Sequence, residues 1–355
     1  MSFDPKQPPD LSIIIPVHNG AAFLRACLDA IFASEYASYE CIVVNDSSTD
    51  GSAAIAREFA ARVLDLPEGP RGPAYARNRG AQAAHGAILM FVDADVVLAA
   101  GALERVANAF RERSGVAALF GSYDAQPAAP GAISQYRNLL HHFVHQNGNP
   151  EASTFWAGCG AIRRSVFAAN RGFDEVQFLR PSIEDIELGY RLRAAGYRIR
   201  LDKGLQGTHL KQWNLYSLIY TDVVCRALPW SRLIIETKNL PDDLNLKMNQ
   251  RASFILAALA CVFLLLSVIY PPSIVLSAAA LLGVVALNRK LYRFFYRPRG
   301  ARFAAACMAL HVLYYLYSGF SYLYAWVEFQ LRGKTAVRSI AALKSAARSI
   351  LGAKS

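Results

Sequence analysis

The segment GAILMFVDAD, residues 86–95, joins an apolar run to two aspartates. An uninterrupted apolar run of this kind, bounded by Gly and Asp, is typical of a buried strand. Asp93 and Asp95 follow it at i and i+2, and ligands of α/β sheets bind beyond the carboxyl ends of the strands. Two carboxylates there can hold a hard divalent cation, which typically bridges phosphates. A strand-to-loop turn with two solvated aspartates also fits the segment, so the rest of the chain must decide.

Strand and helix signals alternate on both sides of this segment. Short apolar runs predict strands, and stretches with helical spacing of apolar residues separate them. The predicted strands are 13–15, 41–44, 62–66, 87–92, 116–120 and 197–201, and the predicted helices are 21–33, 52–61, 75–84, 103–113, 133–144 and 186–195. This alternation predicts an α/β fold with a mostly parallel, Rossmann-like sheet covered on both faces.

Polar residues follow the other early strands as they follow residue 92. The first strand ends in Pro-Val-His-Asn-Gly and the second in Asn-Asp-Ser-Ser, while the helix at 75–84 carries an arginine. Asp50 and Ser52 are better explained as helix caps. The candidate ligand contacts at this edge of the sheet are Pro16, His18, Asn19, Asp46, Arg77 and Asp93.

The excess of basic charge lies in the C-terminal region. Residues 288–355 contain twelve Lys or Arg and one acidic residue, so their balance of +11 equals the formal charge of the whole chain. A basic region can bind nucleic acid or an anionic membrane. The apolar run Ala252–Tyr270 has no charged residue and is close to the ~20 residues that cross a bilayer, and 273–287 follows it as a second run. The sequence therefore predicts a membrane partner and no nucleic acid.

Basic residues between 289 and 302 predict that both ends of this apolar hairpin, and the N-terminal domain, are cytoplasmic. The third apolar stretch, 303–331, contains His311 and Glu328, and whether it spans the membrane stays open. The predicted organisation is a catalytic domain at 1–210, interfacial helices at 211–250, transmembrane helices at 251–333 and a basic amphipathic tail at 334–355. The polar start of the sequence predicts no signal peptide, and the scattered cysteines predict reduced thiols.

Three segments, which together hold four spaced motifs, carry a family resemblance. SIIIPVHNG (12–20), ECIVVNDSSTDGS (40–52) and GPAYARNRGAQAAHGAILMFVDADV (72–96) resemble the nucleotide-sugar half of the inverting family 2 glycosyltransferases, which have the GT-A fold. The resemblance covers roughly residues 11–210. It implies that Asp46 reads a nucleobase, usually uracil, that Arg77 contacts the nucleotide, that Asp93 lies near the ribose, and that Asp95 ligates Mn²⁺ or Mg²⁺ on the diphosphate.

The second half of the domain agrees with this resemblance. IEDIELGYRL (183–192) resembles the family's Glu-Asp motif, which implies that Asp185, beside Glu184, is the general base. The alternative is that the two carboxylates only favour a helix N-terminus. In some relatives a histidine at the position of His209 joins the metal, although a lone His is more often structural. FWAGCGAIRR (155–164) resembles the acceptor side, and the candidate acceptor contacts are Trp156, Gly158, Arg163, Arg164 and Trp213.

The resemblance implies transfer of a sugar from a nucleotide donor, with a UDP-sugar expected. The predicted membrane helices favour a lipid or lipid-linked acceptor over a soluble one. If the acceptor is a polyprenyl phosphate, its anionic oxygen needs no base, and Arg163 and Arg164 would bind it. A nucleotidyltransferase or an inactive binding scaffold would also fit these residues. An NAD enzyme is disfavoured because no Gly-x-Gly-x-x-Gly follows the first strand, and the absence of Gln-x-x-Arg-Trp argues against a processive polymer synthase. The sugar and the oligomeric state stay open.

Overall fold

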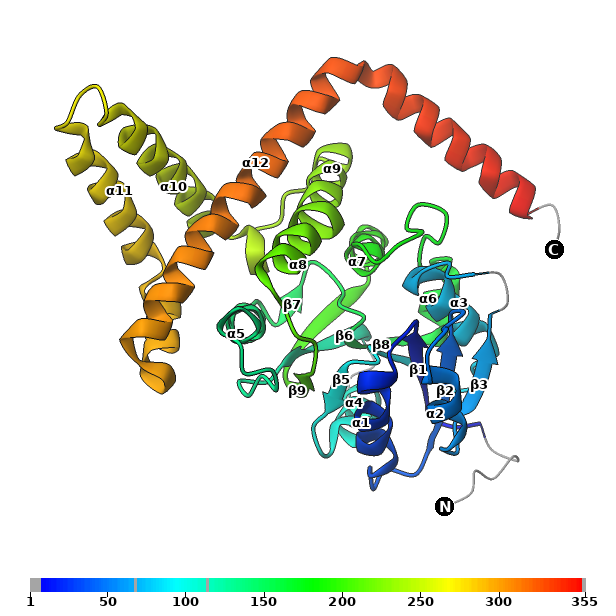
Figure 1. Cartoon of the computed structure of the whole chain (residues 1–355). Coiled ribbons are helices and arrows are strands. Elements are labelled where there is room, and N and C mark those ends of the chain that lie inside the picture. Colours follow the sequence, from blue (N-terminus) through cyan, green and yellow to red (C-terminus); the bar gives the residue numbers. More distant parts are fainter. Residues whose placement is uncertain (1–7, 67–68, 113–114, 353–355) are drawn as a thin grey trace.

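The computed structural model describes residues 8–66, 69–112 and 115–352, with side chains up to residue 331. Its centre is a nine-stranded sheet in the order β3-β2-β1-β4-β8-β6-β9-β5, with β7 paired to β9 (Figure 1). The strands are β1 (Leu11–Val17), β2 (Tyr39–Asn45), β3 (Arg62–Asp65), β4 (Ile88–Val92), β5 (Val96–Leu98), β6 (Val116–Tyr123), β7 (Glu151–Ala152), β8 (Cys159–Arg163) and β9 (Arg198–His209).

The first four strands run parallel because a helix returns the chain between them. β1 pairs in parallel with both β2 and β4, and β2 with β3. The connecting helices are α1 (Ala21–Phe32), α2 (Ser52–Arg57) and α3 (Pro73–Ala83). β8 enters antiparallel between β4 and β6. The predicted α/β fold with a mostly parallel sheet is confirmed, and the carboxyl ends of β1, β2 and β4 share one edge.

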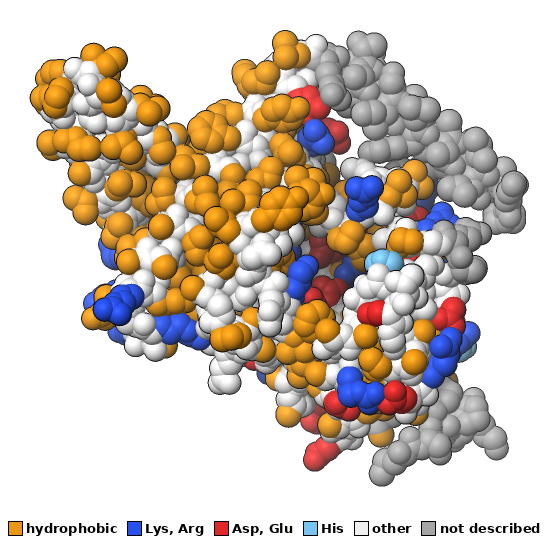
Figure 2. Space-filling model, viewed as in Figure 1, with side chains coloured by type: hydrophobic (Ala, Val, Ile, Leu, Met, Phe, Trp, Pro, Cys, Tyr) orange, Lys and Arg blue, Asp and Glu red, His pale blue; other side chains and the backbone are white. Residues whose placement is uncertain are grey.

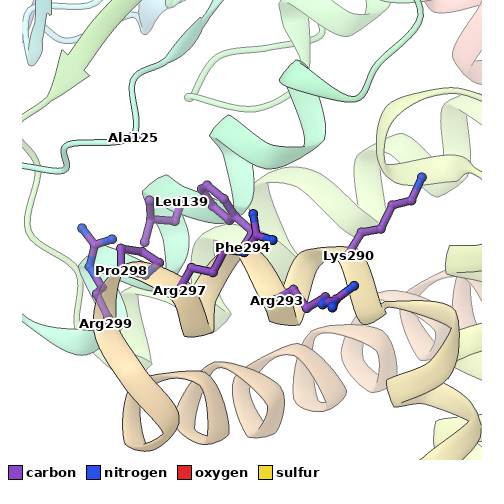
Figure 3. Close-up of a pocket in the computed structure, with 8 residues that line it drawn as sticks. All are labelled: Ala125, Leu139, Lys290, Arg293, Phe294, Arg297, Pro298 and Arg299. Carbon is purple, nitrogen blue, oxygen red and sulfur yellow. The ribbon is translucent and has the colours of Figure 1, made fainter.

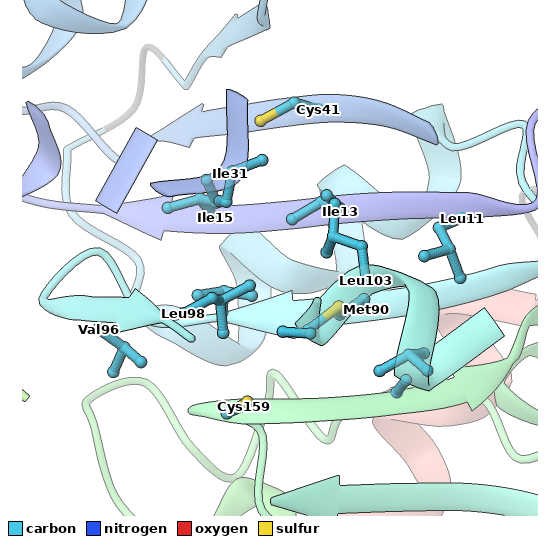
Figure 4. Close-up of a cluster of buried hydrophobic side chains, with 14 of the residues drawn as sticks. Leu11, Ile13, Ile15, Ile31, Cys41, Met90, Val96, Leu98, Leu103 and Cys159 are labelled. Carbon is cyan, nitrogen blue, oxygen red and sulfur yellow. The ribbon is translucent and has the colours of Figure 1, made fainter. Parts of the chain in front are cut away.

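Both faces of the sheet are buried, which explains why its central strands are apolar at nearly every position. Side chains alternate between faces along a strand, so Ile13 and Ile15 pack into the cluster under α1 and α4 (Ala102–Glu112), shown in Figure 4. Ile14 points to the other face, against α3. Helix α3 comes very close there, because a Cβ on Gly80 would lie 2.4 Å from Ile14 Cγ2.

Helices follow the sheet in the second half of the chain. Three of them border the sheet: α5 (Ala132–Gln146), α6 (Arg164–Ala169) and α7 (Glu184–Ala194). The region predicted to hold interfacial helices, 211–250, contains α8 (Leu215–Tyr220), the π-helix η1 (Thr221–Ala227) and α9 (Leu228–Thr237). A short 3₁₀ turn, η2 (Leu244–Leu246), leads to α10 (Met248–Leu266), α11 (Ser273–Leu287) and α12 (Arg289–Gly352).

Figure 1 shows α10 and α11 as a hairpin that projects away from the sheet, with α12 running beside α9. By length and composition, α10 and the Arg289–Leu331 part of α12 can cross a membrane. Helix α11, predicted as a second span, has only 15 residues. Hydrophobic side chains cover the hairpin surface in Figure 2. The predicted amphipathic tail, 334–355, lies outside the residues whose side chains are described.

Candidate active site

The two aspartates after β4 turn towards different partners at the carboxyl edge of the sheet. Asp93 accepts a hydrogen bond from Arg77 Nη2 at 2.7 Å, and its backbone N–H donates to the carbonyl oxygen of Gly158 at 3.1 Å. Asp95 Oδ2 lies 3.3 Å from His209 Nε2. The turn is tight, since Val96 N–H donates back to the Asp93 carbonyl at 3.0 Å. One turn therefore presents carboxylates to two separate groups of side chains.

Arg77 is a buried link between the two halves of the domain. Its Nη1 donates to Glu184 Oε1 at 2.8 Å while Nη2 holds Asp93, and only 5% of the residue is exposed. Burial alone would lower the pKa of Arg77, but Asp93 and Glu184 raise that pKa above its usual value. Because both terminal nitrogens bind carboxylates, Arg77 links the two halves of the domain, and its predicted nucleotide contact stays a prediction.

Glu184, like Arg77, is a buried charged side chain whose partners all lie within the protein. Its Oε1 accepts from Arg77, its Oε2 accepts from the backbone N–H of Ser182 at 3.0 Å, and it is buried. The carboxylate therefore stabilises the first turn of α7 and anchors Arg77. This arrangement fits a positioning residue beside Asp185, and the predicted catalytic role of Glu184 stays a prediction.

Asp185 stands in the first turn of α7 and is only partly buried. Its Oδ2 accepts the backbone N–H of Ala157 at 2.9 Å, and its Oδ1 accepts that of Ile186 at 2.8 Å. Burial and the neighbouring charge of Glu184 raise the pKa of Asp185 to about 7, against the opposing effect of the Ala157 hydrogen bond and Arg77. A carboxylate whose pKa lies near neutrality is suited to accepting a proton.

Residues 156–158 join Asp185 to the donor-side residue Asp93. Ala157 holds Asp185, and Gly158 holds the backbone of Asp93. The Trp156 ring packs edge-on against Tyr123 with centroids 5.0 Å apart. A Cβ on Gly158 would lie 2.7 Å from that Trp156 ring, so the loop needs glycine here. The structure thus brings the predicted acceptor residues Trp156 and Gly158 into the site.

Asp46 ends β2 and shapes the loop before α3. Its carboxylate accepts the backbone N–H of Arg71 at 3.0 Å and that of Gly72 at 2.8 Å. Gly72 has φ +90°, and a Cβ there would lie 2.7 Å from the Leu179 carbonyl oxygen, so only glycine fits. Asp46 is 3% exposed. Its location at the strand end is as predicted, and direct contact with a nucleobase stays a prediction.

The loop after β1 lies beside this group. His18 Nδ1 is 2.8 Å from the Asp46 carbonyl oxygen, and Asn19, at φ 52°, receives a backbone bond from Thr49 at 2.8 Å. Pro16 stays within β1, where it pairs with Val44. The three residues lie at the carboxyl end of β1, where the sequence places them.

Asp50 and Ser52, predicted as helix caps, bind backbone N–H groups where α1 and α2 begin, although the N-cap residues themselves are Gly20 and Gly51. Asp50 accepts the backbone N–H of Ala21 at 3.0 Å and that of Ser52 at 2.9 Å, at the starts of α1 and α2. Ser52 Oγ accepts the backbone N–H of Gly20 at 2.9 Å. These side chains stabilise the loops that carry the site and take no part in it.

Asp95 and His209 provide a donor set that fits a divalent cation. His209 is buried, and its Nδ1 lies 2.8 Å from Asn138 Oδ1, which leaves Nε2 directed at Asp95. In metal-bound histidines, a hydrogen bond from the ring nitrogen that does not bind the metal fixes the orientation of the ring. Burial raises the pKa of Asp95, but His209 and Lys211 outweigh it and lower that pKa. Oxygen and imidazole donors suit Mn²⁺ or Mg²⁺ when phosphate oxygens complete the coordination.

The described residues contain no group of three or more His, Cys, Asp or Glu arranged around one metal position. A cation held by Asp95 and His209 would therefore need further oxygens from a bound substrate, and the metal role of the two residues stays a prediction.

Arg163 and Arg164 lie at the other end of the sheet, so their predicted acceptor role is wrong. In the antiparallel pair of β4 and β8, Val92 faces Cys159 and Ile88 faces Arg163. Arg163 donates to the carbonyl oxygens of Val116 at 3.0 Å and Phe110 at 2.9 Å, and Arg164 donates to that of Ala84 at 2.9 Å. A sequence resemblance places residues along the chain but does not show the direction of the strand that carries them.

Trp213 is buried against α5, and Lys211 Nζ lies 4.5 Å from its ring centroid. Sequence reasoning missed Lys211, which is exposed and acts electrostatically on Asp95.

Sequence reasoning also missed the polar face of α5, whose members contact Trp213, His209, Trp156 and the Gly121 carbonyl. That face has the spacing i, i+4, i+7, i+11, which was a usable signal: Ser134, Asn138, His141 and His145.

Known proteins resemble this chain over its N-terminal half. The model of the family Glycosyl transferase family 2 matches residues 12–170. Glycosyltransferase GlyA of Streptococcus pneumoniae serotype 4 is 40% identical over 88 residues, which are 24% of this chain and 13% of that protein. The probable glycosyltransferase YdaM of Bacillus subtilis is 27% identical over 210 residues, 55% of this chain and 49% of that protein.

Among solved structures, mannosyltransferase PcManGT from Pyrobaculum calidifontis, in complex with GDP-Man and Mn²⁺, superposes with a TM-score of 0.56. It is 18% identical and the match covers 90% of this chain and 88% of that one, which shows a shared fold. The chain spans less than half of the length of the curated relatives named above. The predicted family and GT-A fold are confirmed: residues 12–170 of this chain are a glycosyl transferase family 2 domain.

Proposed function

We propose that the protein is a membrane-attached inverting glycosyltransferase that moves a sugar from a nucleotide donor, a UDP-sugar, to a lipid or lipid-linked acceptor. The observation that carries the proposal is the loop 156–158, which holds Asp93 on one side and Asp185 on the other. A donor-side carboxylate and a candidate base thereby lie on one rigid support at the carboxyl edge of the sheet.

Asp185 is the proposed general base. The acceptor hydroxyl oxygen forms a bond to the anomeric carbon from the face opposite the diphosphate, the bond from that carbon to the diphosphate oxygen breaks, and the hydroxyl proton passes to Asp185. Backbone N–H groups of Ala157 and Ile186 fix the orientation of the carboxylate. A single displacement of this kind inverts the anomeric configuration.

Asp95 and His209 would hold Mn²⁺ or Mg²⁺, and Asn138 would orient the imidazole. When bound, such a cation supplies Lewis-acid stabilisation of the negative charge on the departing diphosphate. Lys211 adds a positive charge on the same side of the site, since it lowers the pKa of Asp95. Removing Lys211 should therefore weaken nucleotide binding even at saturating metal.

The apolar helices support a lipid-borne acceptor. Helix α10 and the Arg289–Leu331 part of α12 are long and apolar enough to cross a bilayer, and α12 pairs with α9 through Glu328 Oε2 and Arg232 Nε at 2.8 Å. An acceptor carried by the membrane would then reach a site already held at its surface. A phosphate acceptor would lack the two arginines expected to bind it, so a hydroxyl acceptor with Asp185 as base is favoured.

The test is nucleotide release by the purified full chain with a panel of UDP- and GDP-sugars, with and without membrane lipid extract. We expect metal-dependent release of nucleoside diphosphate that the lipid extract increases. Asp95→Ala should abolish it, whereas Asp29→Asn, an exposed carboxylate on α1, should not. Release of pyrophosphate would indicate a nucleotidyltransferase, and full activity of Asp95→Ala in excess EDTA would refute the metal role.

A further inference from the structure

A basic pocket lies outside the candidate active site, between α5 and the first turns of α12. Its volume is about 450 Å³, and Figure 3 shows its cationic side chains projecting from one stretch of α12 with apolar side chains among them. We call it the basic pocket and define it by its cations and its two largest apolar side chains: Lys290, Arg293, Arg297, Arg299, Leu139 and Phe294.

The sequence of this stretch separates an apolar face from a basic one. Leu291 and Phe295 are buried against α5, four residues apart on one face of the helix. Arg293 and Arg297 repeat the same spacing on another face and are exposed. The first turns of α12 are thereby fixed to the domain by their apolar side, which leaves the basic side available to a partner.

The charge of the basic pocket is not neutralised within the described residues. No carboxylate lines it, and Lys290, Arg293 and Arg297 have no ion pair in that part of the chain. Arg299 is held in place, because its Nε donates to Gln135 Oε1 at 3.0 Å. Cations held this close repel one another, and a bound anion would relieve that repulsion.

The position of the basic pocket favours an anion that belongs to a membrane. It lies between the end of α11 and the apolar part of α12 that begins at Phe303, and both helices are strongly apolar. Figure 2 shows Lys and Arg side chains gathered directly below the hydrophobic surface of the hairpin. Leu139 and Phe294 give the pocket an apolar wall, which a small hydrated anion does not require.

We propose that the basic pocket binds the phosphate headgroup of an anionic phospholipid, with the acyl chains along the apolar surface of α11 and α12. Lys and Arg side chains next to an apolar membrane segment are attracted to a leaflet that contains anionic lipids. The bound lipid sets the orientation of the catalytic domain on the membrane. The inference does not depend on sugar transfer, so it can fail or hold independently of the proposed function.

The test uses the full chain in neutral detergent, titrated with dihexanoylphosphatidylglycerol or dihexanoylphosphatidylcholine, with binding measured by native mass spectrometry. We expect the anionic lipid to bind about tenfold more tightly or better. The double variant Arg293→Gln/Arg297→Gln should weaken it about 25-fold, at about fivefold for each cation. Arg293→Lys/Arg297→Lys should retain most of the binding, because the interaction is chiefly one of charge.

A matched control separates the pocket from net charge. Arg25→Gln/Arg57→Gln removes the same two charges from exposed positions of the catalytic domain, where each arginine pairs with an exposed carboxylate. It should leave lipid binding within about twofold of the parent. Equal losses in the control and the pocket variant, equal affinity for both lipids, or displacement of the lipid by equimolar glycerol phosphate would each overturn the proposal.

Discussion

Replacing Asp185 by Asn should lower turnover by a factor of about 10² to 10⁴ and, at alkaline pH, make the protein more stable. The carboxyl has a pKa of about 7 in the folded chain, because of burial and the charge of Glu184, against 3.8 for an ordinary aspartate. The pKa of Asp185 is thus higher in the folded chain than in the unfolded one. The stability that this carboxyl contributes is therefore fully present below pH ~4 and is lost as the pH rises through about 7. The ionised group therefore destabilises the fold of the working enzyme.

The size of the effect follows from the same difference. About three pKa units at about 1.36 kcal/mol each make ionised Asp185 cost roughly 4 kcal/mol of unfolding free energy at pH 8. The amide nitrogen of Asn cannot accept one of the two bonds from Ala157 and Ile186, which costs about 1 kcal/mol. Asp185→Asn should thus be more stable than the parent by roughly 3 kcal/mol at pH 8 and less stable by about 1 kcal/mol at pH 4.

The assay is the thermal unfolding midpoint of both proteins in detergent from pH 4 to pH 8, beside Asp29→Asn as a control with an exposed carboxylate. In parallel, kcat/KM of the parent should fall about tenfold per pH unit below pH ~7, and the variant should lose a factor of about 10² to 10⁴. If the midpoints of parent and variant differ by the same amount at pH 4 and pH 8, Asp185 is ionised without penalty and the assignment of the base fails.

Four further changes test the rest of the site. Arg77→Met leaves Glu184 buried without its partner and should lower the unfolding free energy by about 3–5 kcal/mol, and adding Glu184→Gln should restore part of it in a double-mutant cycle. Asp95→Ala should remove Mn²⁺-dependent protection against thermal unfolding, measured by titration of the metal with nucleotide present. Gly158→Ala should reduce kcat about tenfold or more while the fold persists, because its methyl group would displace the Trp156 ring. Arg163→Ala should leave KM for any acceptor unchanged within about twofold, and a large rise in KM would restore an acceptor role for this residue.

The sequence predicted the sheet well because its strands are buried on both faces and read as continuous apolar runs. Residues 88–92 and 41–44 are strands as expected, with every member buried. It did not predict β8, because glycines interrupt this segment, and so it could not show that Arg163 lies at the edge away from the site. Strand β5, only three residues long, also lacked a sequence signal and was missed.

The sequence predicted the position of a site residue where a motif lies at the end of a strand or helix. It could not predict a role that depends on contacts between distant parts of the chain. Asp93, Asp95 and Asp185 follow directly from strand and helix ends, and all three lie at the expected edge. The role of Arg77 depends on Glu184, a residue 107 positions away that only the folded chain brings within 2.8 Å. Its charge suggested a ligand, and its burial between two carboxylates shows a structural link.

Helix α5 connects the apolar helices of the C-terminal region to Asp95 and His209. Asn138 on this helix orients His209, while its neighbour Arg137 binds Asp222 of the π-helix η1 at 3.1 Å. Asp222 also accepts a hydrogen bond from Tyr317 of α12 at 2.6 Å. A π-helix is an uncommon conformation that is frequent at functional sites. A shift of α12 relative to the sheet would therefore move Asp222 and Arg137 first and the imidazole next, so the geometry around Asp95 depends on how the apolar helices are held.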